Sequence, residues 1–339
     1  MSQTALVITS IAGPDSSTLK IYAKECSDRN VPFIVIGDTK SPDEFDLPGC
    51  DFWSVDRQLK FNSKLAPLIP TRHYARKNLG YLIALQNGAE SIMETDDDNL
   101  PLGKGFWDFC SRSPMVEAYD VNVEGWVNVY SYFSEKVVWP RGLPLEEVRK
   151  PTKPLKELEL TKVCCPIQQG LADENPDVDA IYRLTYPLPL NFEREIQVAL
   201  GSNSWCPFNS QNTFWFKKVM PLMYLPAHCS FRMTDIWRSF IAQRIAWANG
   251  WSVLFHGATV WQERNEHDLL KDFEDEIPGY MNNTKIALAL AALDLPKGRE
   301  HIYDNLIKCY DIMIVNGWVG EQEAPMVRAW CEDMSRITG

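Results

Sequence analysis

Short apolar runs alternate with a helical pattern in the first part of the chain. The segments TALVITS (4–10), VPFIVIGD (31–38) and DFWSVD (51–56) are rich in apolar residues that favour strands, and turn residues bound them, so they predict strands. Between the first two, residues 16–29 place apolar side chains three and four positions apart, which predicts a helix. Apolar strands that alternate with helices predict a parallel sheet covered on both faces.

A second helical pattern precedes an unusual acidic cluster. Residues 72–89 carry one apolar face and end at an Asn-Gly pair, a common C-terminal stop. The short strand SIMET (91–95) follows, and three aspartates, Asp96, Asp97 and Asp98, come directly after it. The triplet is therefore predicted at the carboxyl end of a strand in an open parallel sheet, where such sheets bind their ligands.

The middle of the chain has a less regular pattern. VEGWVNVYSYF (123–133) predicts a strand, and the proline-rich, mixed-charge stretch 140–162 predicts an excursion over the surface. Further on, CPFNSQNTFWF (206–216) predicts a turn followed by a strand. The apolar spacing of 235–249 predicts a helix, and WSVLFHGATVW (251–261) predicts a strand pair or one long bent strand.

The pattern is helical from about residue 282 to the C-terminus. The chain is therefore predicted to consist of one domain over residues 1–280 and a helical extension over residues 281–339. Such an extension can cap the domain or join two copies of the chain. A homo-oligomer that forms through these helices is accordingly one expectation.

Composition and charge narrow the classes of function. The 339 residues are 45% hydrophobic and 23% charged, which is ordinary for a globular protein. The net charge is −11 and the pI is near 5.0, so the surface repels phosphate backbones and nucleic-acid binding is not expected. A polyanionic substrate would need a local positive site or a metal ion.

Cysteine use and the N-terminus predict a cytoplasmic protein. Nine cysteines occur at irregular spacing without a Cys-x-x-Cys pair, which favours buried thiols in a reducing compartment over a disulfide framework or a zinc site. The N-terminus lacks the basic and apolar regions of a signal peptide. No run approaches about 18 uninterrupted apolar residues, so no membrane span is expected.

The aspartate triplet fits two interpretations. Carboxylate oxygens are hard ligands that suit Mn²⁺ or Mg²⁺, and these ions keep positions open for substrate phosphates. A cation held by Asp96 and Asp98 would also relieve the repulsion among neighbouring charges. In the alternative, Thr95 caps a helix whose first turn holds the aspartates. The preceding strand, and the lack of an apolar helical period from Asn99 onward, favour the cation site.

Two longer segments carry a resemblance to a known family. YARKNLGYLIALQNGAESIMETDDDN (74–99) and RMTDIWRSFIAQRIAWANGWSVLFHGATVWQERNEHD (232–268) resemble the STELLO family, proteins with a predicted glycosyltransferase domain. Together with PFNSQNTFWF (207–216), they also resemble, more distantly, the reversibly glycosylated polypeptides, which include UDP-arabinopyranose mutases. The resemblance covers about residues 1–280.

The resemblance implies a GT-A fold, which is α/β and Rossmann-like, with a mostly parallel central sheet and helices on both faces. Residues 1–280 would form the catalytic domain that binds a nucleotide sugar together with a divalent metal ion, Mn²⁺ or Mg²⁺. STELLO proteins carry a membrane anchor ahead of this domain, and no such anchor is expected in this chain.

The resemblance also implies roles for the triplet and for the later helix. Asp96 and Asp98 match the aspartates that bind the metal ion and the nucleotide, and Asp97 can replace either. Asp235, at the start of the later helix, matches an acidic residue that faces the acceptor and would act as a general base on its hydroxyl. In the alternative, Asp235 is a helix N-cap beside Thr234.

The third metal ligand departs from the family's pattern. Many GT-A enzymes place a metal-binding histidine at the end of the strand that follows this helix, and the matching residue here is Gln262. The metal ion would then be held by the aspartates together with Gln262, Glu263 or His267. His256, earlier in the same strand, is expected to be structural.

Further polar residues are candidates for binding the donor. Arg76 and Lys77 are natural partners of a diphosphate, or else belong to a solvated helix face. Asp177 and Asp179 match an acidic loop that flanks the site in both families and would orient the sugar or the acceptor, unless they form a solvated turn. The side chains that can bond sugar hydroxyls, or that only satisfy a turn, are Asn209, Ser210 and Asn212.

Three functions agree with these residues. The leading hypothesis is a metal-dependent glycosyltransferase that moves a sugar from a nucleoside-diphosphate donor, UDP being the first candidate, to a hydroxyl group of a glycan or other acceptor. The first alternative is a nucleotide-sugar mutase, which is an isomerase. The second is a non-catalytic partner protein that keeps the fold without turnover. The fold alone does not decide among the three.

Overall fold

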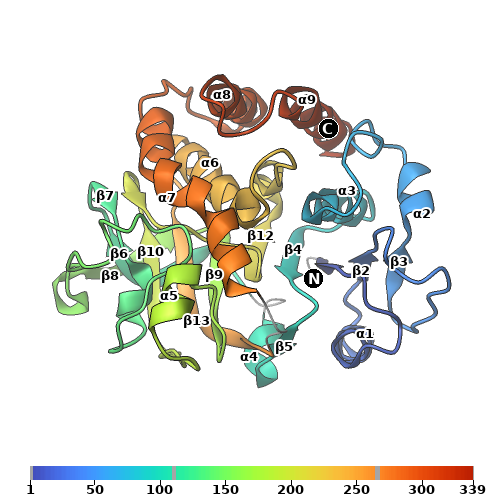
Figure 1. Ribbon diagram of the computed structural model, residues 1–339, viewed down its shortest axis with the longest axis horizontal. Coiled ribbons are helices and arrows are strands. Elements are labelled where there is room, and N and C mark those ends of the chain that lie inside the picture. The colour runs from blue at the N-terminus through green and yellow to red at the C-terminus, as the bar shows by residue number, and fades with distance from the viewer. Residues whose placement is uncertain (1–2, 109–111, 264–267, 339) are drawn as a thin grey trace.

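The computed structural model describes residues 3–108, 112–263 and 268–338. Within these ranges the centre of the fold is one sheet of eleven strands with helices packed on both of its faces (Figure 1). The strands stand in the order β3-β2-β1-β4-β12-β9-β13-β10-β6-β8, and β5 pairs with β13 beside this order. The α/β class expected from the sequence is therefore confirmed.

The N-terminal part of the sheet is parallel. Its strands are β1 (Thr4–Thr9), β2 (Phe33–Ile36), β3 (Asp51–Trp53) and β4 (Ser91–Thr95). β1 lies between β2 and β4, with Val7 opposite Ile34 on one side and Glu94 on the other. Because the four strands run the same way, their carboxyl ends meet at one edge of the sheet, and the aspartate triplet follows β4 at that edge.

The rest of the sheet is mixed. Its strands are β5 (Asn99–Pro101), β6 (Met115–Val121), β8 (Glu159–Cys164), β9 (Ile167–Asp173), β10 (Gln197–Leu200), β12 (Asn212–Phe216) and β13 (Val253–Gln262). β12 is antiparallel to both β4 and β9, so β9 and its parallel neighbour β13 run in the direction of β4. β8 does the same. Seven of the eleven strands in the described ranges thus share one direction, as the expected mostly parallel sheet requires.

Helices cover both faces of the sheet. They are α1 (Ser17–Asp28), α2 (Val55–Leu59), α3 (Lys77–Gln86), α4 (Gly103–Trp107), α5 (Ala180–Thr185), α6 (Thr234–Ala248), α7 (Leu269–Ala291), α8 (Ile302–Val315) and α9 (Glu323–Thr338). Leu6 and Ile8 of β1 pack with α1 and α4, whereas Val7 packs with α3 in the larger core. This alternation is the two-residue period of a strand that is buried on both faces.

The C-terminal helices form an outer layer over α3 and α6 (Figure 1). Met313 of α8 and Trp330 of α9 belong to the same buried cluster as Val7 of the central sheet. α7 runs through residue 280 without interruption. The expected helical extension is present, and the division of the chain at residue 280 stays a prediction.

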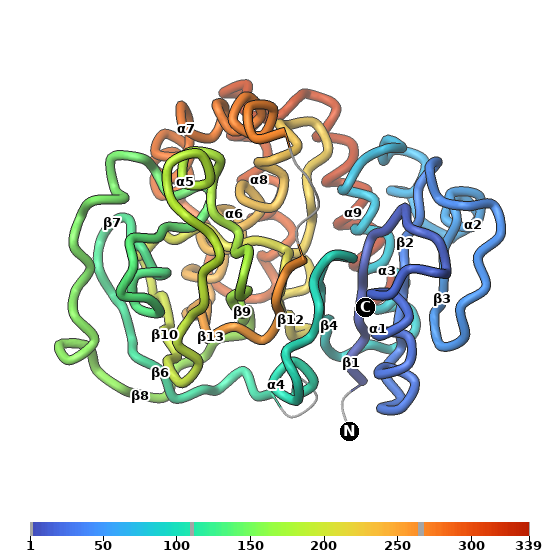
Figure 2. The backbone as a smooth tube through the Cα atoms, turned by 60° about the horizontal axis from the view of Figure 1, so that its bottom comes forward, coloured from blue at the N-terminus to red at the C-terminus, as the bar shows by residue number. Residues whose placement is uncertain are grey.

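The second view separates the two ends of the sheet. β1, β2 and β3 with α1 and α2 lie at one end, and β6, β8 and β10 lie at the other (Figure 2). A small two-stranded sheet of β7 (Gly125–Trp126) and β11 (Ser204–Trp205) lies beyond the main one.

Two expectations for the middle of the chain are wrong. Residues 123–133 do not form a strand, since only β7 is extended and Val129–Tyr132 forms a 3₁₀ turn. The apolar side chains of residues 123–133 follow one another closely in the core and do not form one face of a strand. The stretch 140–162 is a surface excursion only in its later part, because residues 138–144 are buried.

The helix predicted at 72–89 begins later than its pattern. α3 starts at Lys77 and is preceded by a 3₁₀ turn over Tyr74–Arg76, which His73 caps by accepting a hydrogen bond from the Ala75 amide. This tighter start brings Lys77 under the end of β4, where its side chain is fully buried.

No helix in the described ranges is long and apolar enough to cross a membrane. The cysteines of these ranges form no disulfide.

Candidate active site

A buried polar cluster fixes the end of β4. The Glu94 carboxylate accepts hydrogen bonds from the Tyr81 hydroxyl of α3 and from Trp215 Nε1 of β12, the latter at 2.7 Å. Arg238 of α6 completes the cluster, with Nη2 2.9 Å from Glu94 Oε1. All four side chains are buried. Since a buried charge without its partner is costly, this pairing fixes β4 and the turn that follows it.

Asp96, the first residue after β4, lies beside a buried lysine. Lys77 Nζ donates to the Thr95 carbonyl at 2.8 Å and to Asp96 Oδ1 at 3.0 Å. Burial raises the pKa of Asp96 to about 7, against the opposing effect of Lys77, and the nearby Asp98 adds to the rise. A bound cation would favour the ionised carboxylate.

The other two aspartates have different partners. Asp97 accepts a hydrogen bond from Ser10 Oγ, just after β1. Asp98 Oδ2 accepts one from Gln262 Nε2 at the end of β13, at 2.8 Å. The triplet forms the turn between β4 and β5, so the alternative in which Thr95 caps a helix is wrong.

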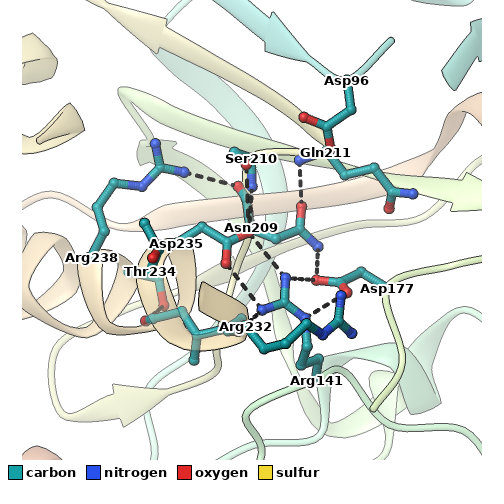
Figure 3. Close-up of polar contacts among 12 residues, drawn as sticks. Asp96, Arg141, Asp177, Asn209, Ser210, Gln211, Arg232, Thr234, Asp235 and Arg238 are labelled. Atoms are coloured by element: carbon teal, nitrogen blue, oxygen red, sulfur yellow. Dashed lines mark hydrogen bonds and ion pairs between the residues drawn. The ribbon is translucent and has the colours of Figure 1, made fainter. Parts of the chain in front are cut away.

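Asp96 faces a cavity of about 90 Å³, which we name the inner cavity. Its lining comes from widely separated parts of the chain, namely Asp96, Arg141, Asp177, Arg183, Gln211, Arg232, Asp235 and Gln262. Acidic and basic side chains both line it, several of which Figure 3 shows. A cavity of this kind can hold a polar group and orient it through charged hydrogen bonds.

Arg141 is the centre of the polar contacts around the inner cavity (Figure 3). It makes two-pronged ion pairs with Asp177, at 2.7 and 2.8 Å, and with Asp235, at 3.0 Å from each oxygen. Asn209 Nδ2 donates to Asp177 Oδ2 at 2.8 Å. Ser210 N lies 3.3 Å from Asp235 Oδ2. Loops and a helix that are distant in sequence are thereby joined at one point.

Asp235 lies in the first turn of α6, as the sequence indicated. Burial alone would raise its pKa, but the guanidinium of Arg141, helped by those of Arg238 and Arg232, holds the pKa below its usual value. Because both oxygens are bound to Arg141, the carboxylate is a weak proton acceptor in this arrangement. Its role as a general base stays a prediction.

Asp97 faces a second hollow of about 280 Å³, which we name the outer pocket. It opens at the ends of β1 and β2 and is lined by Thr9, Ser10, Ile11, Ile36, Gly37, Asp38, Lys40, Arg72, His73, Tyr74, Arg76, Asp97 and Phe231. Asp38 shapes one wall, because its carboxylate accepts hydrogen bonds from the backbone amides of Arg72 and His73, at 2.8 and 3.0 Å.

Arg76 is buried in the wall of the outer pocket. It donates to Gln58 Oε1 at 2.7 Å and to the Ile69 carbonyl at 3.0 Å. Its Nη2 is buried and has no hydrogen-bond partner among the described residues. A cation so placed can attract the negative charge of a ligand in this pocket.

The structure brings most of the predicted residues together, but not all of them. Asp179 caps α5 by accepting from Tyr182 N and also accepts from Trp139 Nε1, both at 2.7 Å, so it lies behind the inner cavity and Asp177 faces it. Burial raises the pKa of Asp179 to about 6. Asn212 donates to the Leu171 carbonyl and is buried in the sheet, away from both hollows.

Sequence reasoning missed Arg141. It lies in a proline-rich stretch that predicts surface structure, and nothing in its neighbours shows that it is buried. The one available signal was electrostatic, because Asp177 and Asp235 were predicted at the same site and two buried carboxylates need a cation.

The donor groups of the triplet suit a hard divalent cation. Asp96 and Asp98 offer carboxylate oxygens, and the Gln262 side chain lies against Asp98. The described residues contain no group of three His, Cys, Asp or Glu side chains arranged to hold a metal ion. Mn²⁺ or Mg²⁺ would therefore take its remaining ligands from a substrate or from water, as such ions commonly do.

Two histidines lie in or near β13 in the sequence, and only His267 was a candidate metal ligand. His267 lies outside the described residues. His256 is buried in β13 with its Nε2 2.8 Å from Arg112 Nη1, and burial together with Arg112 lowers its pKa to about 3. It is not among the residues that line the inner cavity. That His256 is structural stays a prediction.

One known protein family matches the last third of the chain. Residues 232–338, which include α6, β13 and the C-terminal helices, match the family of STELLO glycosyltransferases. The resemblance predicted from the sequence is thereby confirmed for this family. The more distant resemblance to UDP-arabinopyranose mutases stays a prediction.

Two individual relatives extend the match over most of the chain. Probable glycosyltransferase STELLO2 of Arabidopsis thaliana is 29% identical over 320 residues, which are 90% of this chain and 41% of the relative. Probable glycosyltransferase STELLO1 of the same plant is 27% identical over 348 residues, which are 98% of this chain and 44% of the relative. The chain thus spans less than half the length of these relatives.

One solved structure is distantly similar. It is described as the crystal structure of a mycobacterial protein, and the match covers 83% of this chain and 74% of that one, with 10% identity and a TM-score of 0.42. A likeness this distant carries no information about function.

Proposed function

We propose that this chain is a metal-dependent glycosyltransferase that moves a sugar from a nucleoside-diphosphate donor, with UDP as the first candidate, to a hydroxyl acceptor. One observation carries the proposal. The aspartate triplet separates the two hollows, since Asp97 lines the outer pocket and Asp96 lines the inner cavity. A donor with its nucleoside in the outer pocket would pass its diphosphate along the triplet and place its sugar at the inner cavity.

The metal ion belongs to the same proposal. Asp96 and Asp98 would hold Mn²⁺ or Mg²⁺, with Gln262 beside them. When bound, the ion would neutralise the diphosphate oxygens and stabilise the diphosphate as it leaves. Lys77 holds Asp96 in place from the protein side, and the buried Arg76 adds positive charge near the outer pocket.

The remaining side chains would orient the sugar and the acceptor. In the transfer, the acceptor oxygen forms a bond to the anomeric carbon, the bond from that carbon to the diphosphate breaks, and the acceptor hydroxyl loses its proton. Asp235 is the predicted proton acceptor, and it would become available only after Arg141 has moved away from it. Asp177 and Gln211 would bond sugar hydroxyls from the opposite wall.

The same ion pair favours a second candidate, a protein that binds the donor without transferring the sugar. If Arg141 stays on Asp235, the carboxylate predicted to be the general base is not available. A mutase is a third candidate that uses the same donor. Incubation with Mn²⁺ and a set of nucleotide sugars separates the three. A transferase releases free UDP by slow donor hydrolysis, a mutase interconverts ring forms without UDP release, and a binding protein does neither.

Metal-dependent donor binding is tested by a thermal shift with UDP in the presence of Mn²⁺ or of EDTA. We expect UDP to raise the melting temperature only with Mn²⁺, because the ion bridges the triplet and the diphosphate. Asp98→Ala should abolish that shift, whereas Asp43→Ala, which removes an exposed aspartate far from the triplet in sequence, should leave it unchanged. An unchanged shift in Asp98→Ala would contradict the metal site.

A further inference from the structure

α7 has two faces with different environments. Its inner face is tied to the core of the fold, where Glu276 accepts hydrogen bonds from Arg232 and from the Ala180 amide, and where Asn283 bonds Trp237 Nε1. Gly279 packs so closely on Met233 that an added Cβ would lie 2.3 Å from the sulfur. The orientation of this 23-residue helix is therefore fixed, and its outer face is fixed with it.

The outer face carries a line of exposed apolar side chains. Leu270, Ile277, Met281 and Leu288 are 71%, 41%, 62% and 67% exposed. Their spacing of seven, four and seven residues keeps them on one side of a helix, over about 27 Å at 1.5 Å per residue. Scattered apolar residues on a surface need no explanation, but four that are regularly spaced along one side of a rigid helix indicate a contact surface.

The line has a mirrored order about its centre. Counting outward from Gly279, Ile277 and Met281 lie two residues away on either side, and Leu270 and Leu288 lie nine residues away. An identical helix placed antiparallel across this centre would bring Leu270 against Leu288 and Ile277 against Met281. Each apolar side chain would then meet another.

One pair of opposite charges beside this line follows the mirrored order to within one residue. Glu274 lies five residues before the centre and Lys285 lies six residues after it, and both are exposed. The antiparallel arrangement therefore places Glu274 of one copy near Lys285 of the other, twice per pair. Glu274 also has Lys271 Nζ at 3.0 Å, an exposed ion pair that leaves the carboxylate accessible.

We infer that α7 is the self-association surface of this protein, and that two copies pair antiparallel through Leu270, Glu274, Ile277, Met281, Lys285 and Leu288. A two-fold interface must be complementary to itself, and this line satisfies that condition in both its apolar and its charged positions. The inference concerns a face of α7 that contacts neither hollow, so it does not depend on the proposed function.

A second copy fits this surface better than a membrane does. Helices that lie on anionic lipid carry basic side chains along the polar face. Asp272 and Glu276 are buried, and on the accessible side of α7 Glu274 and Asp275 balance Lys271 and Lys285, so this side has no excess of basic side chains. Vesicles containing anionic lipid are therefore expected not to bind the protein, and binding to them through α7 would overturn the inference.

The expected dimer is weak. A stable interface buries about 800 Å² on each partner, and one line of four apolar side chains supplies only part of that area. Sedimentation velocity over a range of protein concentrations should therefore show a monomer–dimer equilibrium. A protein that stays monomeric up to millimolar concentration would overturn the inference.

Charge exchange tests the antiparallel pairing directly. Glu274→Lys alone and Lys285→Glu alone should each raise the dimer dissociation constant at least tenfold, because each puts two like-charge contacts into the dimer. The double variant Glu274→Lys with Lys285→Glu should restore the dissociation constant to within about threefold of the wild type, a change of well under 1 kcal/mol. Single effects without restoration in the double variant would exclude this pairing.

Apolar variants complete the test. Ile277→Glu with Met281→Glu should abolish the dimer, whereas Val315→Glu, which changes an 80% exposed apolar residue at the end of α8, should not. Unchanged dimerisation in the α7 variant would show that any dimer forms elsewhere. Melting temperature and UDP binding, measured on each variant, should match the wild type, because these side chains face away from the core.

Discussion

The outer pocket and the inner cavity lie on either side of the same three aspartates, yet they are built differently. The outer pocket, of about 280 Å³, is formed by the ends of β1 and β2 with the turn before α3, and its Asp38 carboxylate accepts hydrogen bonds from backbone amides and not from charged side chains. The inner cavity, of about 90 Å³, is closed by ion pairs between side chains 36 and 94 positions apart in the sequence.

The difference shows where each region depends on the rest of the fold. The outer pocket follows mainly from parallel strands that end at one edge, together with the turn before α3, and it contains no buried ion pair like those of Arg141 among the contacts described above. The inner cavity depends on Arg141, which holds Asp177 and Asp235 together from a loop without regular structure. A substitution in the outer pocket should therefore disturb only its neighbours, whereas a substitution in the inner cavity should destabilise several elements at once.

The largest expected effect comes from Arg141→Ala. The substitution removes the cation that pairs with the buried Asp235 and the largely buried Asp177, which should cost about 3–5 kcal/mol in the free energy of unfolding. Urea unfolding measures this cost. Arg149→Ala, at an exposed position eight residues later, is the matched control and should change the free energy by less than about 0.5 kcal/mol. If both variants changed the free energy of unfolding by the same small amount, the inner cavity would not depend on Arg141.

The pH dependence of metal binding should be the next effect in size. Burial raises the pKa of Asp96 to about 7, and a cation must displace that proton, so Mn²⁺ affinity should fall up to tenfold for each pH unit below about 7. Titration calorimetry at several pH values measures this, and Asp96→Asn should bind weakly at every pH. An affinity that stays constant from pH 8 to pH 5.5 would contradict the assignment.

The same raised pKa affects the metal-free protein. The folded state holds the Asp96 proton up to about pH 7, whereas an unfolded aspartate releases it near 3.8. The contribution of this carboxyl to stability is therefore fully present below about pH 3.8 and is lost as the pH rises through about 7. Adding Mn²⁺ should flatten this part of the stability profile, if Asp96 is a ligand.

The smallest effect is expected in the outer pocket. Ser10→Ala removes the hydroxyl that donates to Asp97 and accepts from the Ala12 amide, which should cost about 1 kcal/mol in unfolding and leave the inner cavity intact. Ser202→Ala, at an exposed position, is the control. A cost as large as that of Arg141→Ala would show that the outer pocket is not locally built.

The two regions also differ in how much of them the sequence predicts. Strands β1, β2 and β4 and the helix before the triplet are local patterns, so the parallel end of the sheet and the position of Asp96 to Asp98 were predicted correctly. The misread segment 123–133 has apolar residues in succession, which a strand and an irregular buried loop can both contain. Local spacing cannot distinguish them.

A single sequence does not show which side chains distant in the chain contact each other. Asp179 and Asp177 have the same chemistry and lie two positions apart, yet Asp179 caps a helix and Asp177 bonds Arg141. The difference arises from the direction of the loop after β9, which tertiary packing sets. Asn212 was likewise a candidate for bonding sugar hydroxyls, but its side chain is buried within the sheet.

The Glu94 cluster has a consequence for how ligands would bind. It joins β4 to α3, β12 and α6 by charged hydrogen bonds directly beneath the turn of the aspartates. Conformational entropy of that turn is therefore lost when the chain folds and not when a donor arrives. Binding at the triplet would start from a preorganised turn, and a change at Trp215 or Tyr81 would weaken affinity without touching any ligand.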